Sequence, residues 1–212
     1  MRQPVKGQPG RREVKARATR HRILDAAERQ FIRDGYAVTT ITAIAEAADV
    51  AVQTVYAVFG SKRAILAELL AVRTVGDDDS ATLSDRGDWQ AMEREADPRR
   101  QVAALAAIAT RVGGRIAGLY EVMAGAAGSD PEIATMYRQR QQARYQDQRR
   151  VAEALAVRGA LRAGLPAARA ADIIWAIANP RTHHALIAER QWTAAEYERW
   201  LADLLAAALL AR

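Results

Sequence analysis

Two short helical patterns on either side of a tight turn constrain this chain most. The apolar residues that share one helical face are Ile41, Ile44, Ala45 and Ala48, followed after the turn by Val52, Val55 and Phe59. Residues 49–51 are too few for anything but a turn, so two helices of about two turns each must cross at a steep angle. Residues 39–62 therefore predict a helix-turn-helix, which presents its second helix to a DNA major groove.

The charge distribution supports a nucleic-acid partner independently. Residues 1–63 hold 12 Lys and Arg against 6 Asp and Glu, a net charge of +6, whereas residues 64–212 hold 19 of each. The whole excess of positive charge thus lies in the region of the helix-turn-helix, where it would neutralise phosphates. The neutral remainder must serve another purpose.

Composition limits the other classes of protein. Cysteine is absent, which excludes disulfides and thiolate metal sites and fits a reducing cytoplasm. The N-terminus lacks an apolar signal segment, and no apolar run approaches the roughly 18 residues of a membrane span. We therefore expect a cytoplasmic protein that has no membrane partner and needs no cofactor.

The helix signals predict an all-α fold of about nine helices. We expect a disordered basic arm at 1–16, the helix-turn-helix domain at 17–63 and a C-terminal domain at 64–212. The helices expected are 17–34, 41–48, 52–59, 62–75, 98–112, 115–127, 131–158, 166–190 with a kink at Pro180, and 194–211. Residues 76–97 are expected to form a polar linker that contains Trp89.

Residues 17–70 resemble the DNA-binding domain of the tetracycline-repressor (TetR) family of bacterial transcription regulators. The elements that carry the resemblance are the helix ending FIRDGY, Thr39-Thr40-Ile41, Ile44-Ala45, Ala48, Val50, Thr54-Val55-Tyr56, Phe59 and Ser61-Lys62. Two positions differ from the usual pattern. Asp49 replaces the glycine of the turn and tolerates a left-handed conformation, while Ala51 replaces a capping serine and cannot cap the second helix.

The resemblance implies a homodimer that binds an operator in double-stranded DNA and responds to a small-molecule effector. It implies that Thr39 or Thr40, Tyr56 and Lys62 bind phosphates. From helical geometry, the residues that point outward and would meet base edges are Gln53, Thr54, Ala57 and part of Val58. Arg11, Arg12, Lys15 and Arg17 either enter the minor groove or belong to a solvated tail, and the sequence leaves both open.

A ligand cavity is expected in the C-terminal domain. The apolar stripe of helix 131–158, extended inward, would turn Gln141, Arg144 and Gln148 toward the interior, where a polar or anionic ligand or trapped water would satisfy them. The alternative is that the middle of this helix faces solvent. The other ligand-binding candidates are Trp89, Leu119, Tyr120, Met123, Tyr145, Trp175 and Asn179.

The last two helices are expected to form the dimer interface, because the final one is apolar around much of its circumference. Its candidates are Tyr197, Trp200, Leu201, Leu204, Leu205 and Ala208. His183 and His184 do not make a metal site, since neighbours on a helix point about 100° apart. An enzyme is disfavoured because no nucleophile elbow or phosphate loop occurs. A DNA-binding protein whose second domain only dimerises remains an alternative.

Overall fold

The computed structural model describes residues 10–76 and 82–211, and these residues are helical almost throughout. The chain divides into two compact units, residues 1–69 and 70–212. The all-α fold class predicted from the sequence is confirmed, and the only β pairing among the described residues is an isolated bridge between Leu161 and Leu210. Residues 1–9 of the predicted arm and 77–81 of the predicted linker lie outside the described residues.

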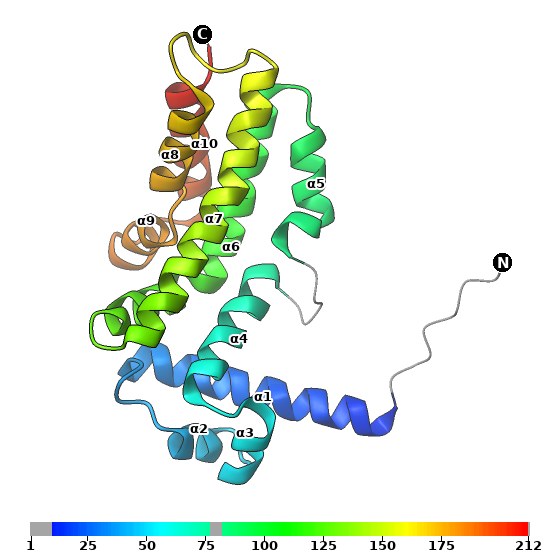
Figure 1. Cartoon of the computed structure of the whole chain (residues 1–212), viewed down its shortest axis with the longest axis vertical. Coiled ribbons are helices and arrows are strands. Elements are labelled where there is room, and N and C mark those ends of the chain that lie inside the picture. Colours follow the sequence, from blue (N-terminus) through cyan, green and yellow to red (C-terminus); the bar gives the residue numbers. More distant parts are fainter. Residues whose placement is uncertain (1–9, 77–81, 212) are drawn as a thin grey trace, which may run out of the picture. The chain divides into compact units, whose positions relative to one another are not determined.

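The first unit consists of three helices and the beginning of a fourth (Figure 1). These are α1 (Arg11–Asp34), α2 (Ile41–Ala47), α3 (Val52–Phe59) and α4 (Lys62–Val75), of which the last continues into the second unit. Their core is formed by large side chains that are less than a tenth exposed, namely Ile23, Leu24, Phe31, Ile44, Val55 and Phe59. Gln30 joins α1 to α2, because its amide donates to the carbonyl oxygen of Ala43 at 2.8 Å.

Helix α1 is longer than the sequence predicted. It begins at Arg11, so residues 11–16, expected in a disordered arm, form its first turns. The prediction was wrong because a run rich in Arg and Lys has good helix propensity without any apolar periodicity. At the other end, Gly35 terminates the helix as predicted, with a φ of 85° and its N–H bonded to the Phe31 carbonyl.

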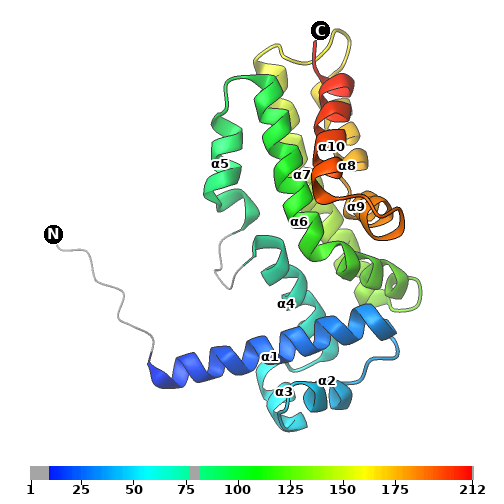
Figure 2. The same ribbon diagram turned by 180° about the vertical axis from the view of Figure 1, so that it is seen from behind.

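The second unit is built around two long helices. Its elements are the 3₁₀ turn η1 (Leu83–Asp85), α5 (Gly87–Arg94), α6 (Pro98–Ala127), α7 (Pro131–Val157), α8 (Ala167–Ile177), α9 (Pro180–His184), the π-helical turn η2 (Ala185–Glu189) and α10 (Ala194–Leu209). Helices α6 and α7 are antiparallel neighbours, and α10 packs beside α6 (Figures 1 and 2). The predicted starts are confirmed: Asp97 caps α6, Asp130 caps α7, and Thr193 and Glu196 form a capping box on α10.

Three details of this unit differ from the sequence prediction. The expected break at Gly113-Gly114 is absent, and α6 runs through both glycines. The expected kink at Pro180 is a full break, since α8 ends at Ile177 and Asn179 caps a new helix by accepting from the Arg181 N–H at 3.0 Å. The expected linker contains α5, whose Trp89 and Met92 are buried.

Helix α6 is also more apolar than the sequence analysis allowed. An 18-residue window in it has a mean hydropathy of 1.4, which meets the composition of a membrane span, and 56% of that window is buried inside the protein. Core helices of globular proteins have the same length and composition, so this helix alone is weak evidence for a membrane.

Candidate nucleic-acid interface and ligand cavity

Helices α2 and α3 form the predicted helix-turn-helix, with an angle of 108° between them. Asp49 in the turn has a φ of 53°, the left-handed conformation expected of the residue that stands in this place. The turn closes through the Val50 N–H, which donates to the Ala45 carbonyl at 3.0 Å. The steep crossing leaves one side of α3 uncovered within this unit.

The exposed side of α3 carries the predicted base-reading residues. Val55 and Phe59 are buried against the unit's core. Gln53, Tyr56 and Ala57 are exposed, and Thr54 is half-buried. Helix α3 begins after Ala51 without a side-chain cap, as the sequence predicted, so its first N–H groups have no capping oxygen from this residue.

The two threonines before α2 have different roles. Thr39 is buried, and its hydroxyl donates to the Gly35 carbonyl at 2.8 Å. Thr40 is exposed and caps α2, since its hydroxyl oxygen accepts from the Ala43 N–H at 3.1 Å. Of the two alternatives for a phosphate contact, Thr40 is therefore the accessible one.

The ammonium group of Lys62 is engaged within the domain. It donates to the carbonyl oxygens of Tyr36 at 2.6 Å and Thr39 at 2.8 Å, and it lies 4.4 Å from the centre of the Tyr36 ring. These contacts fix the segment between α1 and α2. The structure thus gives Lys62, expected at a phosphate, a positioning role.

Basic side chains line the first turns of α1. Arg11, Arg12, Lys15 and Arg17 are all exposed there. They belong to a helix rather than to an extended arm, so insertion of an extended strand into a minor groove is not the geometry that these residues offer. A helical array of cations suits contacts along a phosphate backbone.

The second unit contains a cavity of about 160 Å³ between α6 and α7. Its α6 wall is apolar, formed by Leu105, Ile108, Val112 and Ile116, whereas its α7 wall is polar, formed by Arg140, Arg144, Asp147 and Gln148. Both sets follow helical spacing, so each is one face of its helix. Other elements contribute Thr74, Leu83, Trp89, Asn179 and Tyr197, and α6 adds Tyr120.

Half of the predicted ligand-binding residues line this cavity. These are Trp89, Tyr120, Arg144, Gln148 and Asn179. Leu119 and Met123 are fully buried in the core but do not line it. Two of the others join α7 to α8: Tyr145 donates to Asp172 at 3.2 Å, and the Trp175 carbonyl accepts from Arg144 at 3.0 Å. Gln141 donates to the Tyr137 hydroxyl one turn away on α7 at 3.2 Å.

Sequence reasoning missed the apolar wall although its signal was available. Leu105, Ile108 and Val112 recur at helical spacing within the predicted helix, a pattern that ordinary core residues share. Tyr197 was assigned to the dimer interface, yet it is 1% exposed and lines the cavity. Which apolar face borders a void rather than a neighbour depends on packing between helices, so no single helix reveals it.

Arg144 is the most constrained polar residue of the cavity wall. Its Nη1 donates to the carbonyls of Trp175 at 3.0 Å and Ala178 at 3.2 Å, and its guanidinium lies 5.0 Å from the Trp175 ring centre. Its Nη2 is buried and has no partner among the described residues, as is true of Gln148 Oε1. Burial lowers the pKa of Arg144 to about 10, which still leaves it protonated at neutral pH.

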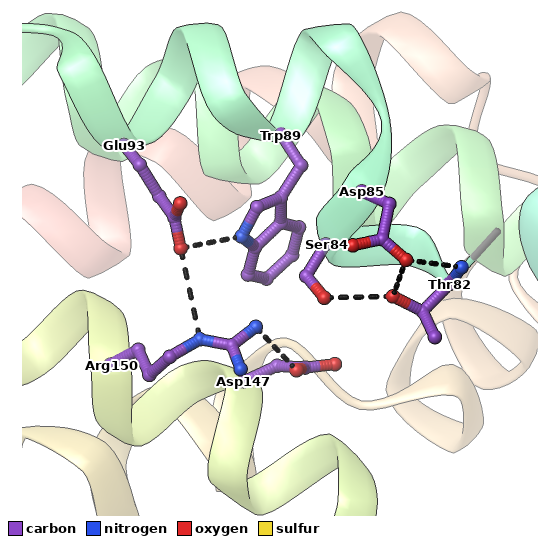
Figure 3. A network of polar contacts seen from close by, with 7 residues as sticks. All are labelled: Thr82, Ser84, Asp85, Trp89, Glu93, Asp147 and Arg150. Atoms are coloured by element: carbon purple, nitrogen blue, oxygen red, sulfur yellow. Dashed lines mark hydrogen bonds and ion pairs between the residues drawn. The ribbon is translucent and has the colours of Figure 1, made fainter.

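A polar network joins α5 to the α7 wall (Figure 3). The Trp89 indole N–H donates to Glu93 at 2.8 Å, and Arg150 lies 3.7 Å from the same carboxylate oxygen. Arg150 also pairs with Asp147 at 2.9 Å. The Asp147 carboxylate, which lines the cavity, is thus paired with Arg150 on the same helix. The hydrogen bond from its indole N–H holds Trp89 in the cavity wall.

The dimer candidates on α10 divide between two faces of the helix. Tyr197, Leu201 and Leu205 are buried within the unit, so they are already covered inside one chain. Leu204 is 36% exposed, and Trp200 and Ala208 are half-buried. Their spacing of four residues places these three along one stripe of α10, and this stripe is open to a second copy.

Residues 23–69 match the sequence profile of bacterial regulatory proteins of the tetR family. No curated protein sequence matches the chain significantly. Among solved structures, the SmeT–triclosan complex has a TM-score of 0.71 at 22% identity, with 92% of each chain covered. NalD, the secondary repressor of the MexAB-OprM multidrug efflux pump in Pseudomonas aeruginosa, has a TM-score of 0.64 at 19% identity and covers 92% of this chain and 98% of its own.

A third solved structure, the transcriptional regulator FadR from Bacillus subtilis in complex with stearoyl-CoA, has a TM-score of 0.67 at 17% identity. It covers 89% of this chain and 98% of its own. At these identities the structures establish the fold alone. Because they cover about nine-tenths of the chain, they do so for both units. With the profile match and the geometry of α2 and α3, the N-terminal domain of this chain belongs to the tetR family of bacterial regulatory proteins.

Proposed function

We propose that the chain is a cytoplasmic transcriptional regulator, acting as a repressor, that binds a palindromic operator as a homodimer and is released by a small molecule. The observation that carries the proposal is the helix-turn-helix of the tetR-type domain, whose α3 exposes Gln53, Tyr56 and Ala57. The excess of basic residues in the same region suits a polyanionic partner.

The exposed residues of α3 favour A·T base pairs. The Gln53 amide can pair with adenine, and the methyl groups of Thr54 and Ala57 suit thymine. Helix α3 contains no Arg or Lys, the residues that most often read guanine. We therefore expect an operator whose half-sites are read mainly at A·T pairs.

The test is to select genomic fragments on the purified protein and to measure their affinity by fluorescence anisotropy. Gln53→Ala should weaken operator binding by about 1 to 3 kcal/mol and leave nonspecific binding nearly unchanged. Gln142→Ala, an exposed glutamine on α7, is the matched control and should bind as the native chain does. An equal reduction by Gln53→Ala on all sequences would argue against direct readout.

The basic residues of α1 are expected to add affinity without specificity. Replacing Arg11, Arg12 and Lys15 by glutamine keeps the helix and removes three exposed charges. The slope of log affinity against log salt concentration should then shrink by about 0.9 for each phosphate that these side chains neutralise in the native complex. An unchanged slope assigns these residues to solvent.

The cavity supports a regulator that responds to a ligand over one whose second unit only dimerises. A void lined by two arginines, an aspartate and a buried glutamine is a costly feature in a domain that needs only to pair with its copy. The structures of SmeT with triclosan and of FadR with stearoyl-CoA are examples of the same fold with a small molecule. We propose no catalytic activity for the chain, because the family profile that it matches and the similar structures of NalD and FadR are those of regulators.

A further inference from the structure

The cavity's wall carries more positive than negative charge. Arg140, Arg144 and Asp147 are the charged residues that line it among the described residues. The Asp147 carboxylate pairs with Arg150 at 2.9 Å, outside the set that lines the cavity (Figure 3). The carboxylate of the wall therefore has its own cation outside the cavity.

Arg144 is half-buried, with its Nη2 fully buried, and its partners are neutral. The hydrogen bonds that its guanidinium donates within the described part of the chain end on neutral oxygens, those of Gln141, Trp175 and Ala178. Its Nη2 has no partner among the same residues. A buried, charged N–H group without an acceptor is costly, so this nitrogen is suited to receive an anionic group.

The polar groups are ordered along the cavity. Because α6 and α7 are joined by only a short turn and run antiparallel, Tyr120 and Ile116 lie toward Arg140 and Arg144, and Leu105 lies toward Gln148. Tyr120 lines the cavity together with both arginines, and its ring centre lies 6.5 Å from that of Tyr137 on α7. The cationic end thus carries Tyr120, and Leu105 lies at the other end.

The side-chain oxygen of Gln148 gives a further constraint on the ligand. Gln148 is 6% exposed and lines the cavity, and its Oε1 lacks a donor among the described residues. It follows Arg144 by one turn of α7, so their Cβ atoms are about 6 Å apart. A ligand with a hydroxyl group about one ring's length from its anionic group would satisfy both side chains.

The volume limits the size of the ligand. A cavity of about 150 Å³ lined by apolar residues accommodates benzene, and the present cavity of about 160 Å³ is of that size. The four aliphatic residues of the α6 wall suit a ring rather than a second polar group.

We propose that the effector is a small cyclic carboxylic acid, with its carboxylate on Arg144 and Arg140, its ring against the α6 wall and, where present, a hydroxyl group on Gln148. This inference rests on the proposed function, because it names the ligand of the regulator's cavity. The carboxylate compensates the guanidinium of Arg144 by accepting from Nη2, the nitrogen that has no partner among the described residues.

The test is isothermal titration calorimetry on the full-length protein without DNA. The probes are benzoate and 4-hydroxybenzoate, their neutral isosteres benzamide and 4-hydroxybenzamide, and the cation benzyltrimethylammonium. Each acid should bind at least about tenfold more tightly than its amide, since a charge-assisted hydrogen bond is roughly twice as strong as a neutral one. The hydroxylated acid should be the tightest ligand of the set, and Gln148→Leu should remove its advantage over benzoate.

Arg144→Gln should abolish the preference for acid over amide. Arg138→Gln, on an exposed arginine of the same helix, is the matched control and should keep it. If Arg144→Gln does not fold by circular dichroism, Arg144→Lys and Arg140→Gln are measured instead, and each should reduce the preference. Equal binding of amide and acid, tighter binding of the cation, or no binding of any acid up to about 10 mM, the weak limit for so small a ligand, overturns the proposal.

The outcome is independent of the DNA-binding test. A chain that binds its operator but discriminates none of these acids keeps the proposed function and loses this effector class. A chain that binds the acids in calorimetry but retains no genomic fragment keeps the cavity assignment and loses the regulator.

Discussion

Lys62 stabilises the helix-turn-helix from within. Its ammonium donates to the carbonyls of Tyr36 and Thr39, and Thr39 in turn donates to Gly35. These bonds hold the segment that places Thr40 at the start of α2. The sequence singled out Lys62 as a functional residue. Whether its ammonium faces a phosphate or a carbonyl depends on the path of the loop between α1 and α2, which local sequence patterns do not define.

Lys62→Met should therefore lower the stability of the N-terminal domain. Removing hydrogen bonds from a charged donor to loop carbonyls should cost about 1 to 3 kcal/mol, measured by urea unfolding monitored by circular dichroism. Lys15→Met, at an exposed lysine of α1, is the control and should change the unfolding free energy little. If Lys62→Met unfolds at the native urea midpoint, Lys62 does not stabilise the domain, and the phosphate contact expected from the sequence becomes its role.

Gly113 explains why α6 passes through the glycine pair without a break. A Cβ added at Gly113 would lie 2.6 Å from Cδ2 of His183, whose ring is packed edge-on against Tyr197 at 4.9 Å. The close contact between α6 and α9 thus requires glycine. Tertiary packing outweighs the roughly 1 kcal/mol that a glycine costs in a helix, which is why local propensity predicted a helix end here.

The two neighbouring glycines should respond oppositely to alanine. Gly113→Ala should destabilise the chain by about 1 to 3 kcal/mol, because the methyl group overlaps the His183 ring. Gly114→Ala meets no atom within 4 Å and should stabilise it by about 0.5 to 1 kcal/mol. Thermal and urea unfolding of both variants measure the difference. A Gly113→Ala variant as stable as Gly114→Ala would mean that His183 moves away at little cost.

At the scale of the helices, the sequence was most informative where side chains cap the backbone. Asp97, Asp130 and the pair Thr193 and Glu196 begin their helices where predicted, because a capping oxygen satisfies N–H groups that nothing else can reach. The sequence was least informative where a helix had no cap, as at the start of α1, or where a glycine served packing. The polar face of α7 was anticipated at Arg144 and Gln148, while Arg140 and Asp147 were not.

The faces of α10 permit a test of the dimer that avoids unfolding the chain. Leu204 lies on the open stripe with Trp200 and Ala208, whereas Leu201 belongs to the unit's own core. Leu204→Asp should therefore keep the native unfolding midpoint but give monomers in sedimentation velocity. Operator affinity should fall with it, because a two-fold dimer sets two recognition helices about 34 to 36 Å apart, or a multiple of that spacing.

Ala195→Asp is the matched control for that substitution. Nine residues separate Ala195 from Leu204, so the two lie on opposite sides of α10, and Ala195 is exposed. This variant should remain a dimer. If Leu204→Asp also remains dimeric, the interface lies on another surface and the α10 stripe is open to solvent.

At the scale of the whole molecule, helix α4 is the covalent connection between the two units. It begins at Lys62 in the first and ends at Val75 in the second. In the second unit, Arg115 of α6 donates to the carbonyls of Arg73 at 2.7 Å and Thr74 at 2.8 Å. Thr74 also lines the cavity, as does Ile116 beside Arg115. The C-terminal end of α4 is thus bound to the helix that forms the cavity's apolar wall.

Arg115→Gln should weaken the coupling between effector and operator while leaving each site intact. Coupling in such regulators is typically 5- to 150-fold in affinity, about 1 to 3 kcal/mol, and it acts equally in both directions. We expect the tightest acid of the calorimetric panel to reduce operator affinity of the native chain within this range. In Arg115→Gln the acid should lower operator affinity by a factor close to one, because the contact between α6 and α4 is lost. The acid's affinity for the DNA-free protein should stay within about threefold of native.

Reciprocity makes this prediction stringent. The factor by which the acid weakens operator binding must equal the factor by which the operator weakens acid binding, so anisotropy and calorimetry measure the same quantity twice. Arg99→Gln, at an exposed arginine in the first turn of α6, removes the same charge and should retain the native factor. If Arg115→Gln retains it as well, the coupling does not pass through the contact between α6 and α4. If both variants lose it equally, the effect is one of charge and not of the two carbonyl bonds that Arg115 makes.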